Sequence, residues 1–167
     1  DVLWESVGKA TWQGKTKRGW PGEPPIEWRN YWKQASYATP VMSELHGQKV
    51  LLCFMRQGLV AVNPQNGDIH SSFWFRSRIN ESVNAISPVV VADQVFISSA
   101  YYGIGSALLE VMPGSFTMKP RWQDSVLEIH WSTPIYHNGY LYAFSGRNEP
   151  DARFRCVDFD TGELMWD

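Results

Sequence analysis

The sequence predicts an all-β fold built from repeated four-stranded antiparallel units, and three observations indicate it. First, a Ser-Pro or Thr-Pro pair followed by an apolar residue recurs at Pro40, Pro88 and Pro134, with spacings of 48 and 46 residues. Second, short segments with the apolar alternation of half-buried strands follow each proline. Third, the chain lacks the apolar period of about 3.6 residues that marks an amphipathic helix. A repeat of 46 to 48 residues with four short strands per unit is typical of a β-propeller blade.

Each unit is predicted to contain the same strands in the same order. A second strand follows each proline after a polar break, in GQKVLLCF, ADQVFISS and NGYLYAF, and a third strand is marked by Val62, Val111 and Val157. These markers place three blades of one propeller domain at residues 35–76, 84–125 and 129–167. Residues 1–6, DVLWES, resemble the last strand of a preceding blade, with Trp4 in the place of Trp166. We therefore interpret the chain as a piece of a larger propeller.

The last blade shows the turn before the fourth strand most completely. Asp160, Thr161 and Gly162 supply turn chemistry, because Asp hydrogen-bonds the backbone ahead of it and Gly accepts a positive φ angle. The strand that follows ends in Trp166, which we expect to be a structural anchor.

The other two blades depart from this pattern. In the first blade, Gly67 holds the turn but Ser71 occupies the position that Trp166 has in the last. In the middle blade, Pro113 and Gly114 keep a turn, and Trp122 arrives after an insertion.

Residues 7–34 do not repeat. They contain Trp12, Trp20, Trp28 and Trp32 among basic residues and a Pro-Gly-Glu-Pro-Pro core, which predicts an ordered but irregular insertion. This segment is either a loop folded over a blade and pinned by its own Trp residues, or a binding surface for sugars or a peptide. The first interpretation is preferred, because large aromatic side chains are most often buried.

Composition narrows the class of protein. The chain is 44% hydrophobic and 14% aromatic, which suits a packed β core. A net charge of −2 argues against a nucleic-acid partner, and no apolar run has the length of a transmembrane segment. Cys53 and Cys156 fall on strands of different blades, so we expect no disulfide between them. The sequence contains no Cys-x-x-Cys, His-Glu-x-x-His or Gly-rich phosphate loop, which weakens an enzyme interpretation.

The repeat resembles that of the pyrroloquinoline-quinone-like β-propellers. The pattern Ala-x-x-Pro-Val, a further strand, and Val-Asp-x-x-Thr-Gly-x-x-x-Trp carries the resemblance over about residues 35–167. Within this family the chain is most similar to bacterial propellers related to the outer-membrane assembly lipoprotein BamB. In the family, the Gly and Trp of each blade dock against the neighbouring blade, so the departures in the first and middle blades imply imperfect docking of the Trp there. The resemblance thus implies a structural role for Pro40, Gly67, Pro88, Pro134, Asp160, Thr161, Gly162 and Trp166.

The resemblance implies three functions, of which the first is preferred. One is a non-catalytic scaffold or binding module in the periplasm or elsewhere outside the cytoplasm, with no cofactor and no metal. The second is part of a dehydrogenase that uses pyrroloquinoline quinone and calcium. That reaction needs an Asp base, and many such enzymes place adjacent cysteines over the cofactor; neither feature is identified here. The third is a sensor propeller fused to another domain. The expected partners are the remaining blades and a protein or small molecule.

A ligand site is predicted on one end of the blades, which we call the loop face. It holds the loops between strands two and three, and those between strand four and the next blade. The candidate ligand-binding residues there are Arg56, Gln57, Arg76, Arg78, Asn80, Glu81, Tyr101, Tyr102, His130, Trp131, Arg147, Asn148 and Glu149. Arg and Asn suit carboxylate or carbonyl ligands, and loops on a rigid scaffold commonly bind partners. The alternative is that these side chains pair across blades and satisfy the loop backbone.

Overall fold

The computed structural model describes residues 1–5, 36–79 and 82–167, and these residues form an all-β fold. They contain three four-stranded antiparallel sheets, as the sequence predicts, and in each sheet the strands pair in chain order. The first blade comprises β1 (Val41–Leu45), β2 (Gln48–Met55), β3 (Gly58–Val62) and β4 (Ile69–Trp74). The second comprises β5 (Val89–Val91), β6 (Gln94–Ser99), β7 (Gly105–Val111) and β8 (Met118–Asp124). The third comprises β9 (Ile135–His137), β10 (Tyr140–Ser145), β11 (Arg153–Asp158) and β12 (Leu164–Trp166).

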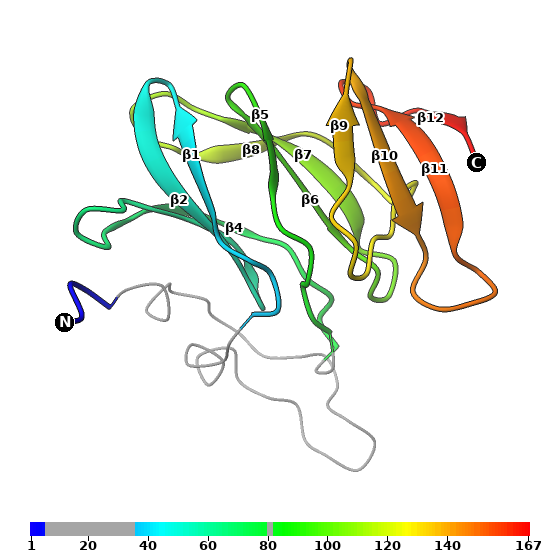
Figure 1. Ribbon diagram of the computed structural model, residues 1–167, viewed down its shortest axis with the longest axis horizontal. Coiled ribbons are helices and arrows are strands. Elements are labelled where there is room, and N and C mark those ends of the chain that lie inside the picture. The colour runs from blue at the N-terminus through cyan, green and yellow to red at the C-terminus, as the bar shows by residue number, and fades with distance from the viewer. Residues whose placement is uncertain (6–35, 80–81) are drawn as a thin grey trace, which may run out of the picture.

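The three blades stand side by side in chain order and share one hydrophobic core (Figure 1). The core runs from Leu52 on β2 through Phe96 on β6 to Leu141 on β10, and all three side chains are fully buried. Because each sheet is apolar on its inner face, stacking the blades removes these faces from water.

The two ends of the blades differ in how the strands are connected. At one end, which we call the turn face, β1–β2 and β9–β10 are joined by two-residue turns, His46-Gly47 and Asn138-Gly139, with positive φ at all four residues. Such turns match the twist of a tight hairpin. At the other end lie the β2–β3, β6–β7 and β10–β11 connections, and this end is the predicted loop face (Figure 1).

A turn of the same geometry precedes the fourth strand of every blade. In each, the last residue donates its N–H to the carbonyl of the first: Gly67 to Asn63 at 2.9 Å, Phe116 to Met112 at 3.0 Å and Gly162 to Asp158 at 3.0 Å. The last residue has a positive φ in all three turns. Pro113 and Gly114 lie within the middle turn, as predicted, and Phe116 is the residue equivalent to Gly67 and Gly162.

Trp122 of the second blade docks on the third blade. Its indole Nε1 donates to the Phe159 carbonyl at 2.9 Å, and a Cβ added to Gly162 would lie 3.0 Å from the Trp122 ring. The expectation of imperfect docking in the middle blade is therefore wrong. The pairing of β7 with β8 has a bulge between Leu108 and Leu109, directly before the pair that Leu108 forms with Trp122.

The first blade docks without a Trp, as its sequence predicts. The Ser71 hydroxyl donates to the Phe116 carbonyl of the second blade, and the His70 ring packs on the Phe116 ring with centroids 4.5 Å apart. Trp4 donates from Nε1 to the Pro64 carbonyl at 3.1 Å, and Pro64 is the turn residue equivalent to Phe159. Residues 1–5 form no strand, so the origin of Trp4 in a preceding blade stays a prediction.

The predicted Trp-rich insertion of residues 7–34 lies outside the described residues. Cys53 and Cys156 are both buried and free, and burial raises the pKa of the Cys53 thiol to about 11. The described part of the chain has no helix that is long and apolar enough to cross a membrane.

Candidate functional site

Side chains from four separate segments meet on the loop face in what we call the loop-face cluster. It comprises Tyr37, Tyr101, Tyr102, His130, Trp131 and Arg147. Tyr37 precedes β1, the tyrosines lie between β6 and β7, His130 and Trp131 precede β9, and Arg147 follows β10. Five of these six residues belong to the ligand-binding set that the sequence predicts, and the structure brings those five together.

The backbone beneath the cluster is held by hydrogen bonds that its N–H groups donate to buried serine hydroxyls. The Ile129 N–H donates to the Ser98 hydroxyl at 2.9 Å, and the Glu128 N–H donates to the Ser145 hydroxyl at 3.0 Å. The Gly146 N–H donates in turn to the Glu128 carbonyl at 2.7 Å. These bonds hold the segment before β9 against β6 and β10, and they set the directions of His130 and Arg147.

His130 is the centre of the cluster. Its Nε2 lies 3.1 Å from the Tyr101 hydroxyl and its Nδ1 lies 3.2 Å from the Arg147 carbonyl. A carbonyl oxygen can only accept, so Nδ1 carries the hydrogen and Nε2 of the neutral ring accepts from Tyr101. The hydrogen-bonded His130 thus joins the β6–β7 loop to the β10–β11 loop.

Aromatic and cationic groups stack around this centre. The Arg147 guanidinium lies 4.2 Å from the centroid of the Tyr101 ring, and the His130 and Trp131 ring centroids are 4.2 Å apart. Tyr37 meets Trp131 edge to face at 5.8 Å. Three rings remain open to solvent: Tyr37 is 67% exposed, Trp131 57% and Tyr102 45%. The cluster therefore presents a broad aromatic surface on a hydrogen-bonded base.

The surroundings of His130 lower the pKa of its imidazole. Burial disfavours the charged ring most, and the Arg147 charge acts in the same direction, against the hydrogen bond to the Arg147 carbonyl, which raises the pKa. The ring is therefore neutral at pH 7, in the tautomer given above. The folded-state pKa of His130 is below the unfolded value of about 6.5. The contribution of this group to stability is therefore complete above pH ~6.5 and is lost as the pH falls from there through the folded-state pKa.

Replacing Arg147 by Gln is expected to raise the pKa of His130. The change removes the cation and part of the covering side chain, and both effects favour protonation, while the backbone carbonyl that accepts from Nδ1 remains. An NMR titration of the His130 ring in wild type and variant measures the shift. Arg121→Gln, far from the cluster on β8, is the matched control. A His130 pKa that is unchanged, or lower, in Arg147→Gln disagrees with this account of the site.

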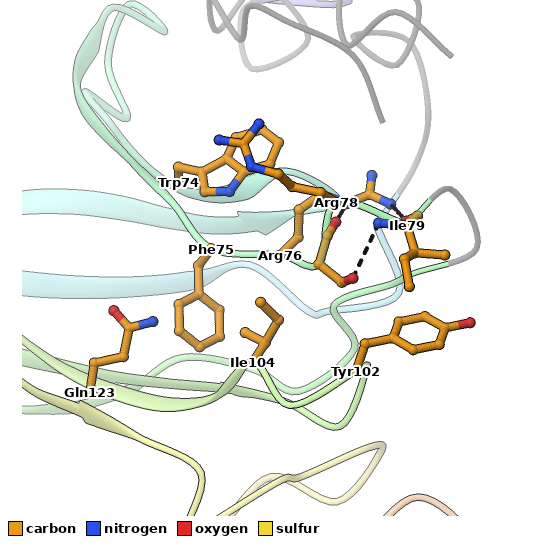
Figure 2. Close-up of a pocket in the computed structure, with 9 residues that line it drawn as sticks. Trp74, Phe75, Arg76, Arg78, Ile79, Tyr102, Ile104 and Gln123 are labelled. Atoms are coloured by element: carbon orange, nitrogen blue, oxygen red, sulfur yellow. Dashed lines mark hydrogen bonds between the residues drawn. The ribbon is translucent and has the colours of Figure 1, made fainter. Parts of the chain in front are cut away.

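A cleft of about 500 Å³ lies next to the cluster, between the first and second blades (Figure 2). Trp74, Phe75, Arg76 and Arg78 line it from the end of β4 and the segment that follows. Tyr102, Ile104 and Gln123 line it from the second blade. Tyr102 belongs to both sites, because its ring lies 6.1 Å from that of Tyr101. The cluster and the cleft therefore form one continuous surface.

The two arginines of the cleft have different roles. Arg76 is buried, and its guanidinium donates to the carbonyls of Ser77, Ile79 and Ser82, each at 3.0 Å. Arg76 therefore holds the loop after β4 in place. This role agrees with the alternative that these side chains satisfy the loop backbone. Arg78 is exposed, and its guanidinium lies 5.7 Å from the centroid of the Trp74 ring. Arg78 is thus presented to solvent at the rim of the cleft.

The remaining predicted residues do not join the cluster. Gln57 is buried, and Arg56 is half-buried in the connection between β2 and β3. Asn148 and Glu149 are exposed in the β10–β11 loop. Asn80 and Glu81 lie outside the described residues. The described ranges contain no group of three or more His, Cys, Asp or Glu side chains that could hold a metal ion.

Sequence reasoning missed Tyr37, Trp74, Ile104 and Gln123. A signal for Tyr37 was present: it stands three residues before Pro40, as Trp131 stands three residues before Pro134. Aligning the repeats on their prolines therefore places both exposed rings at the same position of their blades. Gln123 and Ile104 carry no such signal, because their place in the cleft depends on how two blades pack.

Comparison with known proteins identifies the fold. No model of a known protein family matches the sequence, and no curated protein matches it. Among solved structures, the crystal structure of BamB from Moraxella catarrhalis is similar, with a TM-score of 0.55 and 14% sequence identity. The match covers 91% of this chain and 43% of that one, so the chain spans less than half the length of BamB. The three blades therefore have the fold of part of the BamB propeller.

Proposed function

We propose that the chain is part of a β-propeller that acts as a non-catalytic binding module through the loop-face cluster. The observation that carries the proposal is that exposed rings from three loops form one surface around His130. Trp, Tyr and Arg are the residues that most often dominate the binding energy of protein interfaces. A protein or peptide is therefore the partner that this surface favours. The similarity of the chain's fold to BamB supports a location outside the cytoplasm.

The frame below the surface supports the same role. The loops stand on paired strands, and the segment before β9 is tied to β6 and β10 by hydrogen bonds. A binding surface that is already ordered loses little conformational entropy when the partner arrives. Tyr102 adds to this picture, because it is a non-glycine residue with a φ of 57° that the surrounding structure holds in place.

Further blades are the second partner in this proposal. In the second blade, the paired residues Phe96 and Leu108 are fully buried against the third blade. The ends of the equivalent row in the third blade are more open: Ile135 is 68% exposed and Trp166 46%, whereas their counterparts Val89 and Trp122 are half-buried. In the middle of that row Cys156, the counterpart of Leu108, is already buried. A neighbouring blade whose turn offers a carbonyl to the Trp166 indole, as Phe159 does to Trp122, fits this face.

In the full-length protein, Trp166→Ala is then expected to lower the free energy of unfolding as much as Trp122→Ala does.

Peptide selection tests the binding role. Short random peptides displayed on phage are selected on the full-length protein, and the affinity of the enriched peptides is then measured for variants. Trp131→Ala and Arg147→Ala are expected to weaken binding by about tenfold or more, which is the scale of a hot-spot residue. Arg121→Gln, an exposed arginine on β8, serves as the control. Enriched peptides that bind both cluster variants as tightly as wild type would reject the proposal.

A further inference from the structure

The cleft between the first and second blades has the chemistry of an anion site with an apolar floor. Figure 2 shows Phe75 and Ile104 pointing into its middle, with Arg78 and Trp74 on one side and Gln123 on the other. Its volume of about 500 Å³ lies in the range of small-molecule pockets. The floor suits an aliphatic or aromatic group.

Charge complementarity points to a negative ligand. Of the described residues that line it, two are arginines and none is Asp or Glu. Within residues 1–5, 36–79 and 82–167, no ion pair involves Arg78. Its guanidinium lies 5.7 Å from the centroid of the Trp74 ring, and its N–H groups form a planar edge. An edge of this kind binds a carboxylate through two parallel hydrogen bonds.

We propose that this cleft binds a carboxylate carried by an apolar body, such as the C-terminal residue of a peptide that ends in an apolar side chain. The carboxylate pairs with Arg78, the apolar group lies on Phe75 and Ile104, and the Gln123 amide is placed to bond an amide of the ligand. This inference rests on the proposed function, because it specifies what the loop face recognises beside the cluster.

The direct test compares an acid with its amide. N-acetylphenylalanine and N-acetylphenylalaninamide are titrated into the full-length protein by calorimetry and by ligand-observed NMR. The acid is expected to bind saturably and at least about tenfold more tightly than the amide, because a charge-assisted hydrogen bond to carboxylate is lost in the amide. Equal binding of acid and amide, or no binding of either, overturns the proposal.

Variants assign the effect to Arg78. Arg78→Gln is expected to weaken binding of the acid by about tenfold or more and to leave that of the amide unchanged. The control is again Arg121→Gln, whose guanidinium pairs with Asp160 at 3.0 Å on another part of the surface. Melting curves of both variants confirm that they fold. An Arg78→Gln variant that binds the acid like wild type also overturns the proposal.

A third ligand separates the two sources of the carboxylate. The tripeptide Gly-Gly-Phe with a free C-terminus adds peptide groups to the same end. Tighter binding of the tripeptide than of the acetylated amino acid supports a peptide terminus, and equal binding supports a free organic acid. The peptide selection reads the Trp131 end of the surface, so a failure here leaves that result intact and the two proposals fail separately.

Discussion

Gly105→Ala is expected to destabilise the second blade by roughly 3 kcal/mol or more. Gly105 begins β7 with a φ of 74°, and a Cβ there would lie 1.9 Å from the Asp124 carbonyl oxygen and 2.7 Å from the Ser125 Cα. Both contacts are to backbone, so no side chain can rotate away. Relief requires moving β8 off β7, which breaks the pairing of Ser106 with Asp124.

Gly103→Ala is the matched control for this prediction. Its φ of 72° is nearly the same, but an added Cβ would meet nothing within 4 Å. Only the left-handed conformation is penalised, at a cost of about 1 kcal/mol. Chemical denaturation of the two variants and wild type measures the difference. Similar losses of stability in the two variants would show that the approach of β8 to Gly105 is not the controlling feature.

Trp122→Ala is expected to cost about 2 to 4 kcal/mol, slightly below a fully buried Trp because the side chain is half-buried. The indole packs on Gly162, and its ring centroid lies 5.9 Å from that of Phe96. Its N–H donates to the Phe159 carbonyl. Removing it leaves that carbonyl without the indole donor and opens space between two blades. The loss therefore acts on the joint between the second and third blades.

Three variants separate the parts of this effect in denaturation experiments. Trp122→Phe keeps most of the packing and loses the N–H, so it is expected to cost about 1 kcal/mol. Trp131→Ala removes an exposed ring of the loop-face cluster and is expected to change stability little. Trp166→Ala in the full-length protein is expected to match Trp122→Ala if a further blade covers β12. A Trp122→Ala variant no less stable than Trp131→Ala would refute the docking role.

The repeat pattern predicted the fold because each blade repeats local signals. The prolines before β1, β5 and β9 and the alternation of strands such as GLVAV depend on neighbours in the sequence. The docking of Trp122 was not predictable in the same way. Trp122 lies further along its strand than Trp166 does, and it pairs with Leu108 only after a bulge between Leu108 and Leu109, which local sequence signals do not reveal. The left-handed Phe116 was missed because glycine is the usual residue at such a position.

Five of the six residues of the loop-face cluster were predictable from the sequence, but their arrangement was not. Topology alone puts the loops that carry Tyr101, His130 and Arg147 at one end of the blades, since antiparallel strands joined in order alternate their ends. Which of them touch depends on side-chain packing. Arg76 and Arg78 are two residues apart, yet one is buried among loop carbonyls and the other reaches solvent. The sequence around these two arginines does not distinguish the buried one from the exposed one.

The most direct test of the binding role is to map a selected peptide on the full-length protein by NMR chemical-shift changes. The account predicts shifts in the backbone amides of residues 101–103, 129–131 and 146–148, which surround the loop-face cluster. It predicts no shifts in the two-residue turns at 46–47 and 138–139 on the turn face. A peptide that shifts the turn face, or the sides of the blades, and leaves the amides around His130 unchanged would contradict the claim that this surface binds the partner.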